Sequence, residues 1–478
     1  MPGIRSSEPP SLQFFGAAGT VTGAKFLLRV GRRQVLLDSG LFQGLKALRL
    51  RNWQEPPFDP ARLDAIVLSH AHLDHSGYLP LLVRQRFRGK IFCTSGTADL
   101  LRVMLLDSAH LLEAEAERAN RHGYSKHRPA LPLYTVEDAE ASLRYLRPCG
   151  YGRPVQVTDG VTAVFRRAGH ILGSATVELQ IGAGQPFRLV YSGDLGRWDQ
   201  PILRDPELVS EADILLLEST YGDRVHAAHP AEALARIVQE IAQRQGVLLI
   251  PAFTVGRTQL LIWMLRELES AGRIPALPVY IDSPMGINVA DIYCRHPEDH
   301  DLDMKMLMDQ RQCPLCCRQY HLVKTVEESK ALNRQAGPMI VIAGSGMATG
   351  GRILHHLNRR LSDPQTTVLL VGFQAAGTRG RALQDGAATI RMFGQDVPVR
   401  ARVAVLDGLS AHADRQEFLR WLRGFRTPPQ RTYLVHGEPP QAQGLASTIA
   451  TELGWDVRVA QDGERIDLVK PATSRSRT

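Results

Sequence analysis

The most chemically distinctive stretch of the sequence is LSHAHLDHSGYLP, residues 68–80. It places His70, His72, Asp74 and His75 close together, directly after an apolar run that is typical of a strand. If the pleat of that strand continues, His70 and His72 lie on one face and reach the same ion. Asp74 and His75, on the following turn, then point at a second ion. The stretch therefore predicts a site for two metal ions at the end of a strand.

A hydrolytic centre with two metals needs more ligands than one stretch supplies, including an oxygen ligand that bridges the ions. Three candidates follow other apolar runs and precede turns that contain glycine: His170 in AGHILGSA, Asp194 in SGDLG and His436 in LVHGE. Taken singly, His170 is equally well a loop residue, Asp194 a turn residue and His436 a helix cap. Taken together, they favour one site assembled from the ends of several strands.

The apolar pattern changes twice along the chain. Residues 12–222 contain short apolar runs between Gly, Pro and Asp turns, which predicts strands, with one long helix over about residues 97–120. From about 230 to 395, helical segments alternate with strands, which predicts a mainly parallel sheet covered by helices. After about 400 the first pattern returns. We therefore expect one domain made of residues 1–222 and 401–478, interrupted by an inserted domain at residues 223–400.

Composition sets weaker limits on function. Lys and Arg number 57 against 49 Asp and Glu, a net charge of +8 that favours a polyanionic partner and an ordinary basic enzyme about equally. No stretch is long and apolar enough to span a membrane, and the opening MPGIRSSEPP lacks the apolar core of a signal peptide. We expect a cytoplasmic protein with no membrane partner.

Cysteine is too rare for a disulfide framework. The six cysteines are Cys93, Cys149, Cys294, Cys313, Cys316 and Cys317. The last three form a CxxCC cluster ahead of His321. A structural zinc there would need a second ligand pair that the sequence lacks, so we expect exposed loop thiols.

Four segments, LLDSG with Asp38, SHAHLDHSG, AGHILGSA and SGDLG, resemble in the same order the four motifs of the metallo-β-lactamase superfamily. LLLESTYG with Glu218, GLSAHAD with His412 and LVHGE resemble the three further motifs of its β-CASP subgroup. GSGMATGGR and GFQAAGTRGR resemble the inserted domain of that subgroup. The resemblance implies an α/β fold: a metallo-β-lactamase αββα sandwich with an inserted β-CASP α/β domain of mainly parallel sheet.

The resemblance also implies two zinc ions. The first is held by three histidines, the second by two histidines and a carboxylate, and one further carboxylate bridges both. The resemblance implies that the first ion is held by His70, His72 and His170. It implies Asp74, His75 and His436 for the second ion, and Asp194 as the bridging carboxylate. Asp38 is implied beside them, hydrogen-bonded to a ligand or to the bridging water. We expect the histidines outside the site, such as His355 and His356, to face solvent.

Members of the subgroup process RNA and DNA, so the resemblance implies a zinc-dependent ribonuclease that acts on single-stranded RNA. Two zinc ions sharing a water provide hydroxide near neutral pH, and the 3′-oxygen that it displaces needs a proton. We expect His412 to be the acid, supported by Glu218, and the products to carry 5′-phosphate and 3′-hydroxyl ends. Ser345, Arg257 and Ser410 are expected near the backbone phosphates, partly because Gly-rich turns at helix starts present free N–H groups.

Two alternatives stay open at this point. One is a metallo-hydrolase of small esters or thioesters, for which the additional acid His412 is not required. The other is a non-catalytic subunit of a processing complex, which would have lost metal ligands that this chain retains. The sequence does not distinguish internal cleavage from cleavage at an end, name the target RNA, or decide whether the chain forms a homodimer.

Overall fold

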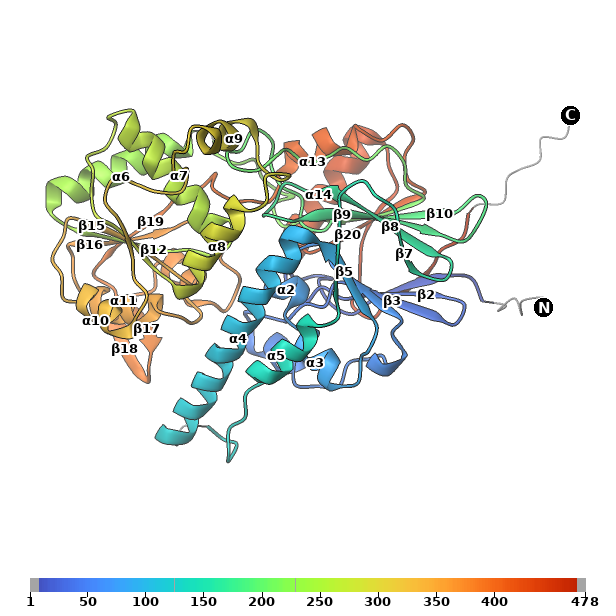
Figure 1. Cartoon of the computed structure of the whole chain (residues 1–478), viewed down its shortest axis with the longest axis horizontal. Helices are drawn as coiled ribbons and strands as arrows, with labels where there is room; N and C mark the ends of the chain where they lie inside the picture. Colours follow the sequence, from blue (N-terminus) through green and yellow to red (C-terminus); the bar gives the residue numbers. More distant parts are fainter. Residues whose placement is uncertain (1–7, 124, 228, 471–478) are drawn as a thin grey trace, which may run out of the picture.

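The computed structural model describes residues 8–123, 125–227 and 229–470, which form two parts placed side by side (Figure 1). One part contains two seven-stranded sheets. The other contains a six-stranded sheet and a two-stranded hairpin. The second part is inserted between the strands Ile214–Glu218 (β11) and Arg431–Val435 (β20) of the first.

The first sheet has the order β22-β1-β2-β3-β4-β5-β6. It is antiparallel from β22 to β3 and parallel from β3 to β6. Its strands are β1 (Ser11–Phe14), β2 (Phe26–Val30), β3 (Arg33–Leu37), β4 (Ala65–Val67), β5 (Lys90–Thr94), β6 (Leu146–Cys149) and β22 (Arg465–Asp467).

The second sheet has the order β21-β20-β11-β10-β9-β8-β7. It is parallel from β21 to β10 and antiparallel from β10 to β7. Besides β11 and β20, its strands are β7 (Val155–Thr158), β8 (Val161–Arg167), β9 (Ala175–Ile181), β10 (Phe187–Tyr191) and β21 (Val457–Val459).

The two sheets face each other across an apolar core and carry helices on their outer faces. In that core Phe26 of β2 meets Tyr191 of β10 edge to face, with ring centroids 5.2 Å apart. The αββα sandwich implied by the motifs is confirmed. The helices of this part are α1 (Lys46–Arg51), α2 (Leu73–Ser76), α3 (Leu79–Arg84), α4 (Ser95–His122), α5 (Val136–Leu143), α13 (Arg415–Leu422) and α14 (Pro439–Leu453), with a 3₁₀ turn at Pro60–Arg62.

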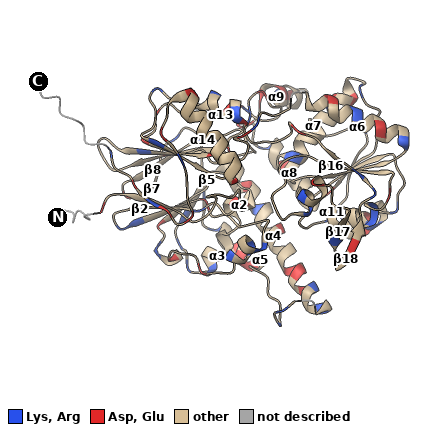
Figure 2. Ribbon diagram, turned by 180° about the vertical axis from the view of Figure 1, so that it is seen from behind, with Lys and Arg blue, Asp and Glu red and all other residues tan. Residues whose placement is uncertain are grey.

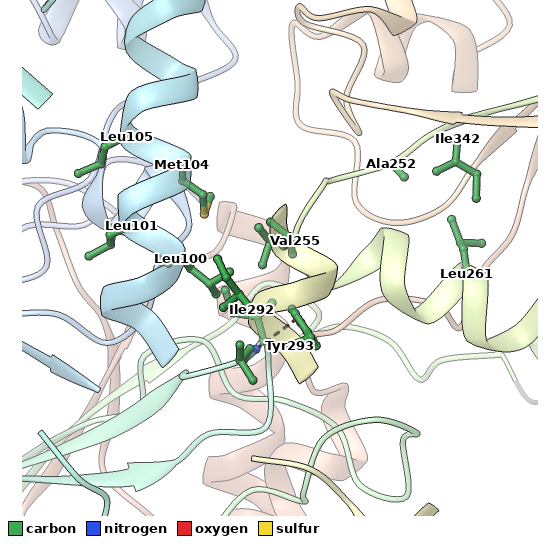
Figure 3. Close-up of a cluster of buried hydrophobic side chains, with 14 of the residues drawn as sticks. Leu100, Leu101, Met104, Leu105, Ala252, Val255, Leu261, Ile292, Tyr293 and Ile342 are labelled. Atoms are coloured by element: carbon green, nitrogen blue, oxygen red, sulfur yellow. Dashed lines mark hydrogen bonds between the residues drawn. The ribbon is translucent and has the colours of Figure 1, made fainter. Parts of the chain in front are cut away.

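Helix α4 joins the two parts. Its first turn is capped by the hydroxyl of Thr94, which accepts the N–H of Thr97 at 3.2 Å, and it ends at Gly123 in the left-handed conformation. Its apolar face packs against the inserted part within one continuous buried cluster (Figure 3). Leu100, Leu101, Met104 and Leu105 of α4 lie there with Val255, Ile292 and Tyr293 of the insertion. The long helix expected over about 97–120 is therefore present and forms the interface between the parts.

The inserted sheet is entirely parallel, in the order β14-β13-β15-β12-β16-β19, which confirms the mainly parallel sheet expected from alternating strands and helices. The strands are β12 (Val247–Pro251), β13 (Val279–Asp282), β14 (Tyr320–Leu322), β15 (Met339–Ala343), β16 (Thr366–Leu370) and β19 (Arg402–Val405), beside the hairpin β17 (Thr389–Met392) and β18 (Gln395–Pro398). The helices are α6 (Pro230–Arg244), α7 (Arg257–Ser270), α8 (Pro284–Cys294), α9 (Leu302–Asp309), α10 (Val326–Leu332), α11 (Ile353–Arg360) and α12 (Arg379–Gln384).

From the change in sequence pattern we expected the chain to return to the first domain after residue 400. The edge strand β19 lies just past that residue. It pairs with β16 and so belongs to the inserted sheet. A strand of four residues carries no sign in its own sequence of the sheet that it joins.

The CxxCC cluster does not consist of exposed thiols, and that expectation was wrong. Cys313 and Cys316 form a disulfide, because two intervening residues bring their Cα atoms to 5.6 Å. Cys317 is buried, with its Sγ 3.8 Å from the carbonyl oxygen of Ile262. Cys93, Cys149 and Cys294 are free, as expected.

His356 was also predicted wrongly. Its neighbour His355 is exposed, but His356 has no exposed surface. Its Nε2 lies 2.6 Å from Asp282 Oδ2 and its Nδ1 lies 2.8 Å from Asn333 Oδ1. These partners come from β13 and from the end of α10, so the buried ring joins three elements of the insertion.

Within the described residues, no helix combines the length and the apolar character needed to cross a lipid bilayer. Lys and Arg are interspersed with Asp and Glu over both parts of the molecule (Figure 2).

The segment after β3 runs against α2 and fixes the position of that helix. The N–H of Ser39 donates to the carbonyl of His75 at 2.7 Å, and the N–H of Leu41 donates to the carbonyl of Leu73 at 2.8 Å. Gly40 lies between them, so close to α2 that a Cβ atom on it would stand 1.5 Å from the carbonyl oxygen of Asp74. Only glycine fits there without moving α2, which carries two of the predicted ligands.

Replacing Gly40 with Ala should therefore lower the free energy of unfolding by about 3 kcal/mol or more, since the clash is with backbone. Chemical denaturation of the metal-free protein measures this. Gly150→Ala is the matched control, because a Cβ there would meet only the Arg153 side chain, at 3.7 Å. Equal stability of the two variants would contradict the close approach of Gly40 to α2.

Candidate metal centre

Most of the predicted ligands lie just past the ends of strands, at one edge of the two sheets, and Asp74 and His75 lie in the short helix α2. His70 follows β4, His170 follows β8, Asp194 follows β10 and His436 follows β20. Potential ligand atoms of His70, His72, His170 and Asp194 lie within 4.8 Å of one another, and those of Asp74, His75 and His436 form a second such group. The structure thus brings all seven predicted residues together, in the two groups expected.

Asp194 lies between the two groups. Its Oδ2 is 3.4 Å from His70 Nε2 and 3.5 Å from His170 Nε2. Its Oδ1 is 3.2 Å from His75 Nε2 and 3.6 Å from His436 Nδ1. Each oxygen of this buried carboxylate faces one group, which is the arrangement that a bridging ligand requires.

Neighbouring side chains hold the ligands in place. The buried carboxylate of Asp38 accepts hydrogen bonds at 2.7 Å from the N–H and hydroxyl of Ser69, from His75 Nδ1 and from the hydroxyl of Tyr191. The bond to Nδ1 leaves His75 Nε2 directed at Asp194. On the other side, the hydroxyl of Thr220 lies 3.0 Å from His436 Nδ1.

The donor set fits a metal. His72 Nδ1 lies 3.1 Å from His70 Nε2 and 3.2 Å from His170 Nε2, so three ring nitrogens crowd one point. His75 Nε2 and Asp194 Oδ1 are buried and make no hydrogen bond with the described residues. Buried polar atoms without partners are unfavourable, whereas imidazole nitrogens and carboxylate oxygens are the ligands that zinc prefers.

Electrostatics also favour a cation. Burial lowers the pKa of His72 to about 4 and holds the pKa of His70 and His170 well below its ordinary value, so these rings keep free lone pairs. Burial alone would raise the pKa of Asp194, but the surrounding histidines hold it well below its ordinary value. The first group therefore offers neutral nitrogen ligands beside an anionic carboxylate. In the second group, burial lowers the pKa of His75, but Asp194 and Asp38 outweigh it and hold that pKa well above its ordinary value.

His412 and Glu218 form a pair beside this centre. His412 Nδ1 lies 3.0 Å from Oε1 of Glu218, which has no exposed surface and accepts backbone N–H groups of Leu195 and Thr220. Burial lowers the pKa of His412, but the carboxylates of Glu218 and Asp194 outweigh it and raise that pKa above the ordinary value. The two carboxylates thus favour the protonated imidazole, and the ring lines the cleft.

A cleft of about 910 Å³ between the two parts contains the centre, and the three expected phosphate contacts line it. Arg257 is only 8% exposed, yet its Nε and Nη1 have no hydrogen-bond partner among the described residues. Ser345 is less available, because its hydroxyl accepts the N–H groups of Thr349 and Gly350. Ser410 is buried and accepts the N–H of His412 at 3.2 Å.

The sequence reasoning missed Ser69, Tyr191 and Thr220. Each lies within three residues of a predicted site residue, at or just past the end of a strand, and that proximity is the signal that could have found them. Tyr191 was hardest to find, because an aromatic residue in a strand is normally part of the core.

Three known protein domains match most of the chain. Residues 33–249 match the beta-lactamase superfamily domain, residues 258–383 match the Beta-Casp domain, and residues 396–460 match the Zn-dependent metallo-hydrolase RNA specificity domain.

Two curated proteins are similar over nearly all of this chain. Ribonuclease TTHA0252 of Thermus thermophilus is 38% identical over 454 residues, which cover 95% of this chain and 98% of the relative. Transcription termination factor FttA of Methanosarcina mazei is 29% identical over 468 residues, which cover 95% of this chain and 71% of the relative.

Among solved structures, a protein of unknown function from Enterococcus faecalis superposes with a TM-score of 0.51 at 12% identity, covering 96% of this chain and 99% of that one, and supports the fold alone. The chain belongs to the metallo-β-lactamase superfamily and, within it, to the group of proteins that carry the β-CASP domain.

Proposed function

We propose that the chain is a zinc-dependent ribonuclease that hydrolyses phosphodiester bonds of single-stranded RNA and leaves 5′-phosphate and 3′-hydroxyl ends. One observation carries the proposal: the two ligand groups that share Asp194 lie beside the His412–Glu218 pair within one cleft. The name of the Thermus relative, a ribonuclease, supports the same substrate.

Two zinc ions fit the proposal better than one, since each oxygen of Asp194 faces a separate group of ligands. His70, His72 and His170 would hold the first, Asp74, His75 and His436 the second, and Asp194 would bridge them. Such ions supply a nucleophile from water near neutral pH and neutralise charge on the phosphate.

His412 supplies the proton that the leaving 3′-oxygen needs. Because Nδ1 is bound to Glu218, the proton on Nε2 is the one delivered into the cleft. Glu218 and Asp194 raise the pKa of His412, which favours the protonated ring. Hydrolysis of small esters or thioesters would not require this acid, so the pair favours phosphodiesters.

Arg257 is the best placed phosphate contact. Its Nε and Nη1 are buried and have no hydrogen-bond partner in the described part of the chain, which is unfavourable unless an anion binds to them. Ser410 and Ser345 line the same cleft, and their hydroxyls already hold backbone groups, so they shape the site around the phosphate. We place the enzyme in the cytoplasm with its RNA.

Removing His436 should empty the second ligand group while the first stays filled. We expect elemental analysis to give two zinc ions per chain for the natural protein and one for His436→Ala, with activity reduced by orders of magnitude. His355→Ala is the matched control, because that histidine is exposed and lies outside both groups. Two zinc ions and full activity in His436→Ala would remove this residue from the site.

Replacing His412 with Ala should separate proton transfer from metal binding. We expect unchanged zinc content and near-normal RNA affinity, with a loss of about 10²–10⁴ in rate. Glu218→Gln should show a smaller defect, and the double variant should be little worse than His412→Ala, because the two residues act as a unit.

The decisive substrate for His412 carries a 3′-phosphorothiolate, whose sulfur departs without a proton. His412→Ala should recover most of its lost rate on this analogue. If the variant is as impaired on the analogue as on ordinary RNA, His412 is not the proton donor.

The cleft should also distinguish single strands from duplexes. A paired strand must open before one phosphate can reach a centre enclosed between two parts of the molecule, so we expect duplex RNA to be cut much more slowly. End-labelled RNA of one sequence, alone or annealed to its complement, measures this. Equal cleavage of both forms would show that the RNA does not have to enter the cleft as a single strand.

A further inference from the structure

The loop that carries His170 is held only in part by its own domain. It connects β8 to β9, and the N–H of His170 donates to the hydroxyl of Ser174 at 3.0 Å. The carbonyl of Gly173 accepts hydrogen bonds from Thr94 and Thr97, at the start of α4, at 2.5 and 2.8 Å. The N–H of Ile171 also donates to the hydroxyl of Ser174, at 3.3 Å. Among the described residues, however, the N–H groups of Leu172 and Gly173 find no partner in the lactamase part, the part with the two seven-stranded sheets.

Those N–H groups bind to the inserted part instead. The N–H of Leu172 donates to the hydroxyl of Tyr293 in α8 at 3.3 Å, a bond that Figure 3 shows within the buried cluster. The N–H of Gly173 donates to Asp299 Oδ2 at 3.2 Å. Both donors are buried, so each would be left unpaired without its partner, which is unfavourable.

A third contact is steric. Ile171 packs against Gly256, where a Cβ atom would stand 2.8 Å from the Ile171 side chain. Gly256 directly precedes Arg257, the proposed phosphate contact in the cleft. The insertion therefore contacts three consecutive residues of the loop, Ile171 to Gly173, immediately after the metal ligand.

The segment that makes these contacts is itself fixed. His300 Nε2 lies 2.6 Å from the carbonyl oxygen of Tyr293, and the N–H of Arg204 donates to the carbonyl of Asp299 at 2.9 Å. The segment between α8 and α9 is thus attached at several points to the lactamase part.

Among the described residues, His170, like His72, lacks the partner that other predicted ligands have on a second ring nitrogen. Ring nitrogens of His70, His75 and His436 lie close to the hydroxyl of Ser69, the carboxylate of Asp38 and the hydroxyl of Thr220. The second nitrogen of His170, Nδ1, makes no hydrogen bond with the described residues. Its direction is therefore set by the backbone of its loop.

We propose that Tyr293 and Asp299 are positioning residues for His170, so that the inserted domain completes the first metal group as well as covering the cleft. The proposal rests on the function proposed above, in which His170 is a zinc ligand. It predicts that loss of these two contacts weakens zinc binding at that group, while the lactamase sheets and the second group are unchanged.

The test measures zinc affinity of the full chain by competition with a chelator. Tyr293→Phe combined with Asp299→Ala should weaken binding of one of two zinc ions by roughly 10–100-fold, the range typical for groups that orient a ligand. Asp299→Asn keeps an oxygen acceptor for Gly173 and should bind zinc nearly normally. RNA cleavage by the double variant should be lost at limiting zinc and recovered at excess zinc.

Two controls match these changes. Tyr134→Phe removes another buried hydroxyl, one that lies 2.7 Å from Ser108 and far in sequence from the loop. Asp301→Asn alters a carboxylate of the same segment that contacts Ile202 and Met304 and not the His170 loop. Both should keep the natural zinc affinity.

A thermodynamic cycle separates positioning from general stability. On a His170→Ala background, Tyr293→Phe should have no further effect on zinc affinity, whereas an effect through overall stability would persist. Should Asp299→Ala fail to fold, Tyr293→Phe alone decides the matter, since it removes a single oxygen atom. Unchanged zinc affinity in that variant would overturn the proposal, whereas absence of zinc binding in the natural chain would overturn the proposed function itself.

Discussion

One buried carboxylate, that of Asp38, ties the two sheets together at the metal centre. It has no exposure to solvent, and a buried charge of this kind is stable only when hydrogen bonds satisfy its oxygens, as Ser69, His75 and Tyr191 do here. Asp38 follows β3 of the first sheet, and Tyr191 ends β10 of the second. The interaction therefore joins the sheets at the point where the ligands converge, and it directs Nε2 of His75 toward Asp194.

The centre is held in conformations that are locally unfavourable. Asp38 and His436 have φ values of 56° and 50°, in the left-handed region that non-glycine residues rarely adopt. Three ring nitrogens face one another nearby, and a carboxylate lies among them. The left-handed residues are strained, so packing elsewhere, such as the apolar cores on either side of the sheets, must offset their cost. Ring nitrogens and a carboxylate that converge in this way are further stabilised by a cation, so metal binding and folding are linked.

The sequence predicted which side chains would lie together, because His70, His170, Asp194 and His436 each follow a strand and Asp74 and His75 come a few residues after His70. Their role as metal ligands stays a prediction. The sequence was insufficient to predict the role of a residue when that role depends on a partner far away in the chain. His356 pairs with Asp282, 74 positions away, and nothing near either residue indicates the pair. Tyr191 has the pattern of a core residue, and its hydroxyl acquires a role only because Asp38 approaches from the other sheet. Cys313 and Cys316 were misjudged for a different reason, since the CxxC spacing allows a disulfide, a metal site or free thiols alike.

The buried cluster between α4 and the insertion determines how the two parts act on each other. Because Leu101 and Met104 of α4 share one core with Ile292 of α8, the insertion is not a loosely attached lid, and relative motion of the parts must disturb packed side chains. The loop of His170 crosses that same boundary, and Gly256, which contacts it, is adjacent to Arg257 in the cleft. The residue that contacts the His170 loop and the residue that lines the cleft are therefore consecutive in the chain, so the surface that faces the cleft and the surface that packs on this loop belong to one short segment of the insertion.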